Sequence, residues 1–299
     1  MIPNEILDRF HVPPGKKLRL ADHDPGWVQT AEMKELGKDV IKERAREILN
    51  KNLAELAEAQ ELLYANDTYS VLVVLQAMDA AGKDGTIKHV MSGVNPQGCQ
   101  VFSFKKPTTE ELDHTFLWRC MKCLPERGRI GIFNRSYYEE VLVVRVHPEL
   151  LEQQQLPTGK RGKAFWEARY DDINAFENHL VRNGTVVLKF FLHVSKEEQK
   201  RRFLERLERP EKHWKFSPSD VAERAYWDDY MKAYEHALSA TSTKWAPWYV
   251  IPADHKWITR AVVADILTST VCSLDLKYPE ITEEKRRAMA EAKRLLEKE

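Results

Sequence analysis

A lysine set among small residues follows an apolar segment at residues 70–77. The segment is β-branched and aliphatic, and it runs into Met-Asp-Ala-Ala-Gly-Lys-Asp-Gly-Thr at residues 78–86. Small residues let successive amides face an anion, the start of a helix favours negative charge, and a lysine reaches terminal phosphates. The pattern predicts a phosphate-binding loop made of Ala81, Gly82, Lys83, Asp84, Gly85 and Thr86.

This loop departs from the common pattern G-x-x-x-x-G-K-[ST] at two positions. Ala77 stands where the first glycine is usual, and Asp84 stands where a hydroxyl residue is usual. An ordinary strand-to-helix turn with a solvated Lys83 is the alternative interpretation. Asp79 is unusual inside such a loop, because a carboxylate repels phosphates unless it binds a metal or takes a proton from the acceptor. Asp79 is therefore a candidate for either task.

A second group of polar residues follows the apolar segment at residues 129–133. Asn134, Arg135, Ser136 and Glu139 come directly after it. In many phosphate-loop enzymes an acid here holds Mg²⁺, and an arginine offsets charge on the transferred group. Asparagine is the weaker ligand, so Glu139 or Asp79 is expected to hold the metal. The alternative is a strand end with a surface arginine and a helix cap at Ser136.

A third motif places Arg202, Arg206 and Arg209 at spacings of four and three. These spacings put the three guanidinium groups on one face of a helix. An irregular stretch at 210–220 follows, so the region of about 200–235 is expected to be a lid that closes arginines onto phosphates and excludes water. Alternatively, the arginines form a solvated face paired with neighbouring glutamates.

Alternating strands and helices must position these motifs. Strands are predicted at 70–77, 99–104, 129–133, 185–192 and 248–251. Helices are predicted at 28–63, 86–94, 109–124, 136–144, 165–182, 195–207, 257–274 and 282–298, and Ser195 with Glu198 fits a capping box. This order is typical of an α/β fold with a parallel sheet, whose ligands lie at the carboxyl ends of strands. Sites are expected after Ala77, Phe133 and Leu192.

Composition excludes several other classes of protein. The 299 residues are 43% hydrophobic, and 46 basic residues balance 46 acidic ones, which argues against a protein that grips nucleic acid through overall positive charge. There is no apolar run of membrane-spanning length, and the four cysteines lack zinc-site spacing. We expect a soluble cytoplasmic protein. Its first 26 residues, rich in proline and glycine, are expected to form an arm over the domain.

The three motifs together resemble the polyphosphate kinase 2 family. The resemblance rests on residues 78–86, 133–139, 198–203 and 214–220, and it extends from about residue 21 to about residue 274. It implies a three-layer α/β/α P-loop kinase fold similar to thymidylate kinase, with a parallel central sheet and a helical lid. We expect a single domain over residues 1–299, with an N-terminal arm and helix at 1–68, in a homo-oligomer.

The resemblance also implies an activity: reversible, Mg²⁺-dependent transfer of the terminal phosphoryl group of inorganic polyphosphate to AMP, ADP or both, with Mn²⁺ as an alternative metal. The forms of residues 95–98 and 134–139 resemble the subgroup that accepts both nucleoside mono- and diphosphates. The implied catalytic residues are Asp79, Lys83, Asn134 and Arg135, with Asp79 and Glu139 on the metal. The implied lid residues are Arg202 and Arg206 on phosphate, and Arg209, Lys212, Trp214 and Asp220 towards the nucleotide.

Two other functions fit the same motifs. One is a nucleoside monophosphate kinase that uses ATP as donor, and the other is a non-catalytic sensor of polyphosphate or nucleotide. All three share a site built from lysine, arginines, amides and carboxylates without a paired serine and histidine, as charge neutralisation of phosphates requires.

Overall fold

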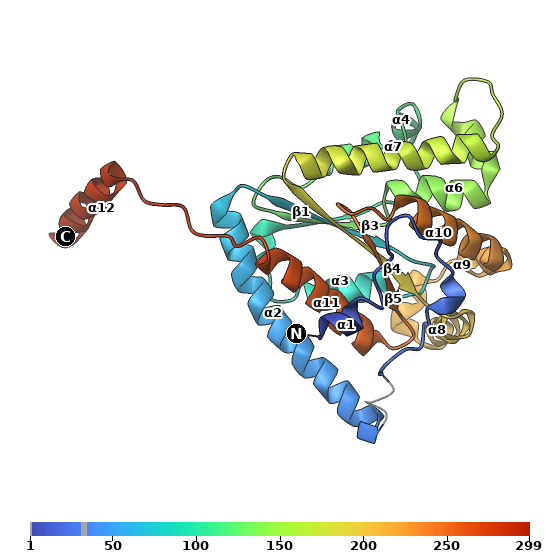
Figure 1. Cartoon of the computed structure of the whole chain (residues 1–299), viewed down its shortest axis with the longest axis horizontal. Helices are drawn as coiled ribbons and strands as arrows, with labels where there is room; N and C mark the ends of the chain where they lie inside the picture. The colour runs from blue at the N-terminus through green and yellow to red at the C-terminus, as the bar shows by residue number, and fades with distance from the viewer. Residues whose placement is uncertain (1, 31–34) are drawn as a thin grey trace.

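The computed structural model describes residues 2–30 and 35–299, which build a parallel sheet with helices on both faces (Figure 1). The strands are β1 (Ser70–Gln76), β2 (Cys99–Ser103), β3 (Ile130–Asn134), β4 (Thr185–His193) and β5 (Trp248–Pro252). Their order in the sheet is β2-β3-β1-β4-β5, and every pairing is parallel. All residues of the central strand β1 are buried, as expected for a strand covered on both faces. The predicted α/β fold with a parallel sheet is confirmed.

The helices on the two faces leave a crevice at the carboxyl end of β1. One face carries α2 (Lys38–Asn66), α3 (Lys83–Val90) and α11 (Lys256–Cys272). The other carries α6 (Val143–Val146), α7 (Lys163–Arg182) and α10 (Trp227–Thr241). The chain leaves β1 towards α3 on the first face, but it leaves the neighbouring strand β3 towards α6 and α7 on the second. Loops that diverge in this way open the crevice in which α/β proteins bind ligands.

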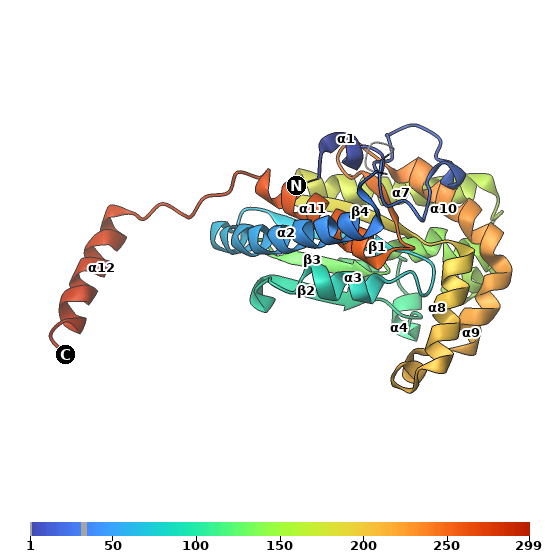
Figure 2. The ribbon, with the colours of Figure 1, turned by 90° about the horizontal axis from the view of Figure 1, so that it is seen from below.

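A helical projection stands beside this crevice. It consists of α8 (Lys196–Glu208), a 3₁₀ helix (Pro210–Lys215) and α9 (Pro218–Ala222) (Figure 2). The Ser195 hydroxyl caps α8 by accepting from the Glu198 amide at 3.1 Å, as predicted. The second half of the predicted capping box is wrong, because the Ser195 amide donates to Asp254 Oδ1 at 2.8 Å instead. The carboxylate of Asp254, after β5, thus takes the place of the Glu198 carboxylate as the acceptor.

Several predicted helix boundaries differ from the structure. The first long helix begins at Lys38 because Gly37, at φ +76°, precedes it in a left-handed conformation, and residues 31–34 of the predicted helix lie outside the described residues. The helix predicted at 86–94 begins at Lys83 and ends at Val90, and that at 136–144 is a 3₁₀ helix (Tyr137–Val141) followed by α6.

The helix predicted at 109–124 is two short helices, α4 (Thr109–Leu112) and α5 (Trp118–Met121). The break lets Arg119 lie 3.4 Å from Glu111. Eight residues of continuous helix would separate these two side chains by about 12 Å along the axis.

The N-terminal arm closes one edge of the sheet. It begins with α1 (Asn4–Leu7) and then runs antiparallel to β5, with His11 opposite Tyr249. The Val250 amide donates to the Phe10 carbonyl at 2.7 Å, so the open edge of β5 is satisfied locally. At the other end of the chain, α12 (Glu283–Leu296) lies apart from the three layers in both views (Figures 1 and 2). No helix in the described residues has the length and apolar character of a membrane span.

A buried ion pair beneath the sheet anchors the segment that follows β3. Lys189 and Glu177 are both fully buried, and their side chains meet at 2.5 Å. Lys189 also donates to the Tyr138 hydroxyl, and the Tyr137 and Tyr138 hydroxyls each donate to Glu177 Oε1 at 2.8 Å. Every partner is thereby satisfied, which is the condition for tolerating charge inside a core.

We expect Lys189→Met to lower the free energy of unfolding by about 3–5 kcal/mol, because it leaves the Glu177 carboxylate buried without its counterion. The double variant Lys189→Met/Glu177→Gln removes both charges and should be more stable than the single variant. Urea unfolding followed by circular dichroism measures both. A double variant no more stable than the single one would contradict this account.

Candidate active site

A cavity of about 510 Å³ opens at the carboxyl ends of β1 and β3. The whole predicted phosphate loop, residues 79–86, lines it. Asn134 and Arg135 line it from the end of β3, and Arg202 and Arg206 line it from α8. The fold therefore brings residues from all three sequence motifs to one cavity.

Left-handed backbone conformations shape the loop. Gly82, which caps the N-terminus of α3, has φ +111°, a conformation that favours glycine. Ala80 has φ +60°, where a β-carbon is unfavourable by about 1–2 kcal/mol. Such a conformation persists only where surrounding contacts enforce it, and the Gln199 side chain and Arg202 both bond to loop carbonyls.

Lys83 lies beneath the loop and is 8% exposed. Its ammonium donates to the carbonyls of Ala77 at 2.8 Å and Met78 at 3.4 Å. Burial, together with the nearby Arg135 guanidinium, lowers the pKa of Lys83 to about 8. The ammonium is therefore still mostly charged at neutral pH, and its charge can be directed at an anion in the loop.

Arg135 is held between two carboxylates. Its guanidinium lies 2.5 Å from Asp79 Oδ1 and 3.0 Å from Glu139 Oε2. Chiefly through Glu139, these charges raise the pKa of Arg135. Arg135 has φ +64°, and the two ion pairs help to hold this unfavourable backbone. The arginine is thus fixed at the mouth of the loop before any ligand binds.

Glu139 does not fit the metal role implied for it. Its Oε1 accepts from Gln76 Nε2 at 2.8 Å and its Oε2 accepts from Arg135, so both oxygens are engaged. Glu139 is also not part of the cavity lining. In this structure it is an anchor for Arg135, and these contacts favour Asp79 over Glu139 as the metal ligand.

Asp79 retains the properties of a metal ligand. Its carboxylate lines the cavity, with one oxygen on Arg135. No group of three His, Cys, Asp or Glu side chains able to hold a metal occurs within the described residues. Mg²⁺ commonly binds through one or two carboxylates plus substrate phosphates, so a single carboxylate facing a phosphate loop fits that ion.

Asp84, at the usual hydroxyl position, connects the loop to two neighbouring elements. It accepts from Asn134 Nδ2 at 2.9 Å and lies 3.2 Å from Lys215 Nζ. Burial raises the pKa of Asp84, but the bonds from Asn134 and Lys215 outweigh burial and leave this pKa below its ordinary value. The carboxylate is therefore ionised at neutral pH and bridges the loop, β3 and the projecting helices.

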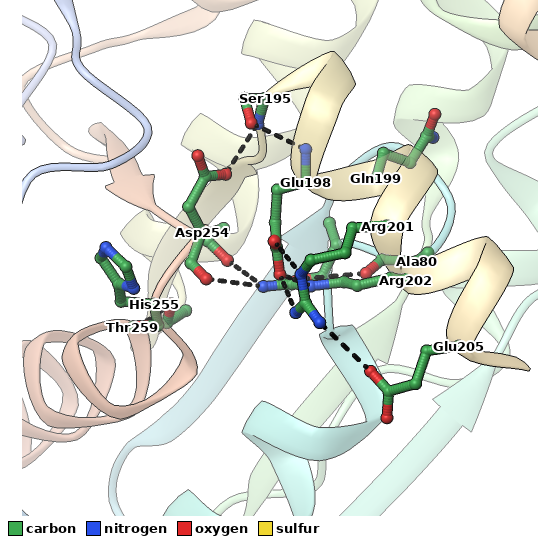
Figure 3. Close-up of polar contacts among 12 residues, drawn as sticks. Ala80, Ser195, Glu198, Gln199, Arg201, Arg202, Glu205, Asp254, His255 and Thr259 are labelled. Atoms are coloured by element: carbon green, nitrogen blue, oxygen red, sulfur yellow. Dashed lines mark hydrogen bonds and ion pairs between the residues drawn. The ribbon is translucent and has the colours of Figure 1, made fainter. Parts of the chain in front are cut away.

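In this structure Arg202 contacts protein groups, whereas the resemblance implied that it would bind phosphate. It is 4% exposed, and its Nε donates to Glu198 at 2.7 Å (Figure 3). Its two terminal nitrogens donate to four backbone carbonyls, those of Ala80, Ala81, Ala253 and Asp254, at 2.6–3.1 Å. A guanidinium has five N–H groups, so every donor is used. Arg202 thus joins α8 to the phosphate loop and to the turn after β5.

The other predicted lid residues fall into two groups. Arg206 and Lys212 line the cavity, where Arg206 lies 3.7 Å from Asp220 and Lys212 is paired with Glu205. Arg209, Trp214 and Asp220 are not in the lining, and Trp214 is 78% exposed. In this conformation the indole of Trp214 faces solvent, away from any base-binding position in the cavity.

The structure adds basic residues that the sequence motifs missed. Lys215 reaches the cavity from the projection, and Lys256 and Arg260 reach it from the first turns of α11. Lys105 reaches the cavity from the segment after β2. The basic lining residues are Lys83, Lys105, Arg135, Arg202, Arg206, Lys212, Lys215, Lys256 and Arg260, and the acidic ones are Asp79, Asp84 and Glu205. Nine positive charges against three negative ones make the cavity a site for a highly charged anion.

We expect Arg202→Lys to weaken binding of inorganic tripolyphosphate about tenfold or more. Lysine keeps the charge but has three donors, so it cannot hold four loop and turn carbonyls in place. Isothermal titration calorimetry measures the affinity. Arg201→Lys is the matched control, because Arg201 is the exposed neighbour on the same helix and also pairs with Glu198. Wild-type affinity in Arg202→Lys would contradict the positioning role.

Comparisons with known proteins agree on one family. Residues 39–279 match the model of the family described as polyphosphate kinase 2. The chain is 54% identical over 256 residues to an ADP-polyphosphate phosphotransferase of Rhodopseudomonas palustris, covering 85% of this chain and 89% of the relative. It is 46% identical over 274 residues to an AMP/ADP-polyphosphate phosphotransferase of Meiothermus ruber, covering 92% and 96%.

A solved structure agrees with these relatives. The crystal structure of polyphosphate kinase 2 from Arthrobacter aurescens superimposes with a TM-score of 0.82 at 41% identity, covering 96% of this chain and 95% of that one. Its P-loop kinase fold is the fold that the family resemblance of the sequence implied. With a family match over most of its length and relatives of this similarity, the chain belongs to the polyphosphate kinase 2 family.

Proposed function

We propose that this protein is a polyphosphate-dependent nucleotide kinase that transfers the terminal phosphoryl group of inorganic polyphosphate to AMP and ADP, and that works in both directions. The observation that carries the proposal is the cavity, where nine basic side chains surround a phosphate loop. The names of the relatives support the same donor, since they describe ADP- and AMP/ADP-polyphosphate phosphotransferases.

The residues of the site divide the work of phosphoryl transfer. The loop amides and Lys83 bind the phosphate that is transferred, and Arg135, fixed by its carboxylates, offsets the charge that develops on it. Asp79 faces the same phosphates and is suited to orient the attacking phosphate oxygen of the acceptor. Direct in-line transfer needs positioning and charge neutralisation, so no covalent nucleophile is required.

Mg²⁺ is the proposed cofactor, with Mn²⁺ as the alternative. Asp79 and the phosphate oxygens of the substrates would hold it, and it would supply further neutralisation of phosphate charge. Asn134, whose amide nitrogen donates to Asp84, is suited to keep that second carboxylate turned away from the phosphates.

A donor-swap assay tests the function. Purified protein is incubated with Mg²⁺ and either AMP or ADP, with long-chain polyphosphate or ATP as donor, and the products are separated by chromatography. We expect ADP from AMP and ATP from ADP with polyphosphate. Turnover with ATP and AMP but none with polyphosphate would indicate the ATP-dependent kinase instead, and tight binding of polyphosphate without turnover would indicate a sensor.

We expect Asp79→Asn and Lys83→Ala each to lower kcat for transfer from polyphosphate by about 10²-fold or more, because each removes a charge that contacts the reacting phosphates. Thermal unfolding checks that both variants remain folded. Lys88→Ala is the control, since Lys88 is exposed one turn further along the same helix. A near-normal rate in either site variant would show that the site is misplaced.

A further inference from the structure

Two basic side chains on α11 face the cavity without a partner of their own. Lys256 and Arg260 form no hydrogen bond or ion pair within residues 2–30 and 35–299, although both line the cavity. Most other basic lining residues are already committed to protein groups. Lys83 and Arg202 donate to carbonyls, and Arg135 is held by two carboxylates.

The lid cations of the lining are also engaged. Arg206, Lys212 and Lys215 lie beside Asp220, Glu205 and Asp84 respectively. Lys105, which comes after β2 and not from α11, is an exposed cation of the lining. The half-buried Arg260 and the exposed Lys256 are the cations on the α11 side of the cavity whose charge remains available to a ligand.

Their position follows from the start of α11. Lys256 is the first residue of this helix, directly after the turn that follows β5, and Arg260 comes one turn later on the same face. A β-carbon placed on Gly85 would lie 3.7 Å from Arg260 Nη2, so the guanidinium lies over the first turn of α3. The two cations thus extend the phosphate loop sideways, towards α11.

Glu205, which is already paired with Lys212, offsets the charge of Lys256 only in part. Burial lowers the pKa of Arg260, and burial together with the nearby Arg202 guanidinium lowers the pKa of Lys256. Cations that face a cavity under such repulsion are compensated when an anion binds.

We propose that Lys256 and Arg260 form a subsite for the polyphosphate chain, next to the phosphate group held by the loop. This subsite rests on the proposed function, in that it takes polyphosphate as one of the two substrates. A nucleotide base would need an apolar or aromatic surface to lie against. Among the described residues that line the cavity, Phe104 is the one aromatic side chain, and it follows β2 instead of belonging to α11.

The test compares Lys256→Ala/Arg260→Ala with wild type in two measurements. The first is direct binding of long-chain polyphosphate without nucleotide, by calorimetry at several salt concentrations. We expect the dissociation constant to rise about tenfold or more, as the loss of two charge-assisted contacts implies, with a weaker dependence on salt. The second is steady-state kinetics, where we expect the KM for polyphosphate to rise while the KM for ADP stays within about twofold.

The control variant is Lys285→Ala/Arg287→Ala, which removes two exposed basic residues near the start of α12, outside the cavity lining. It should bind polyphosphate as wild type does. A rise in the KM for ADP with unchanged affinity for polyphosphate would overturn the subsite and assign these cations to the nucleotide. Unchanged values for both ligands would overturn it as well.

Failure of the subsite can be separated from failure of the proposed function. If wild type transfers no phosphoryl group from polyphosphate, the function fails. The calorimetric affinities of the two double variants for polyphosphate then decide the subsite on their own, since that measurement contains no acceptor and needs no turnover.

Discussion

One buried guanidinium, that of Arg202, joins the three parts of the molecule on which phosphate binding depends. It donates to carbonyls of the phosphate loop and of the turn after β5, while its Nε pairs with Glu198 on its own helix. Carbonyls turned towards Arg202 leave the loop amides free to face an anion. A shift of α8 would carry this guanidinium with it, so the projecting helices and the loop are mechanically coupled.

The concentration of positive charge around one cavity has a structural consequence. Cations placed this close together repel one another, and ion pairs or carbonyl contacts hold most of them in position. Asp79, Glu139 and Asp84 therefore serve the geometry of the site besides any chemical task. Lys256 and Arg260, on the α11 side of the cavity, lack such contacts, so a ligand can neutralise their charge more fully than that of the paired cations.

Deep in the core, a second set of charges supports the same site from behind. Lys189, Glu177 and the hydroxyls of Tyr137 and Tyr138 form a closed network in which each polar atom has a partner. The two tyrosines follow Arg135 by two and three residues, so the network fixes the backbone that presents this arginine. The carboxylates that hold Arg135 and the buried network around Lys189 thus both stabilise one segment, the turn after β3.

Local sequence was sufficient for the strands and for the phosphate loop. The strand that precedes Lys83 is continuously apolar, and the small residues after it allow a backbone that few other residues adopt. Helix ends were less predictable, because Gly37 and the contact between Arg119 and Glu111 override helical periodicity. The residues expected to form sites after β1 and β3 line the cavity. No site was expected after β5, although Lys256, which follows the carboxyl end of that strand, lines the cavity as well.

By itself, then, the sequence determined the α/β fold, the loop and the family, since these depend on residue types at short spacing. Only the tertiary structure decided how each charge is used. Arg202 was read from helical spacing as a ligand for phosphate, and Glu139 from its motif as a metal ligand, but both have all their polar atoms bonded to protein groups. The partners of a charged side chain come from distant segments, such as the turn after β5 for Arg202. The spacing of residues along the sequence does not predict such partners.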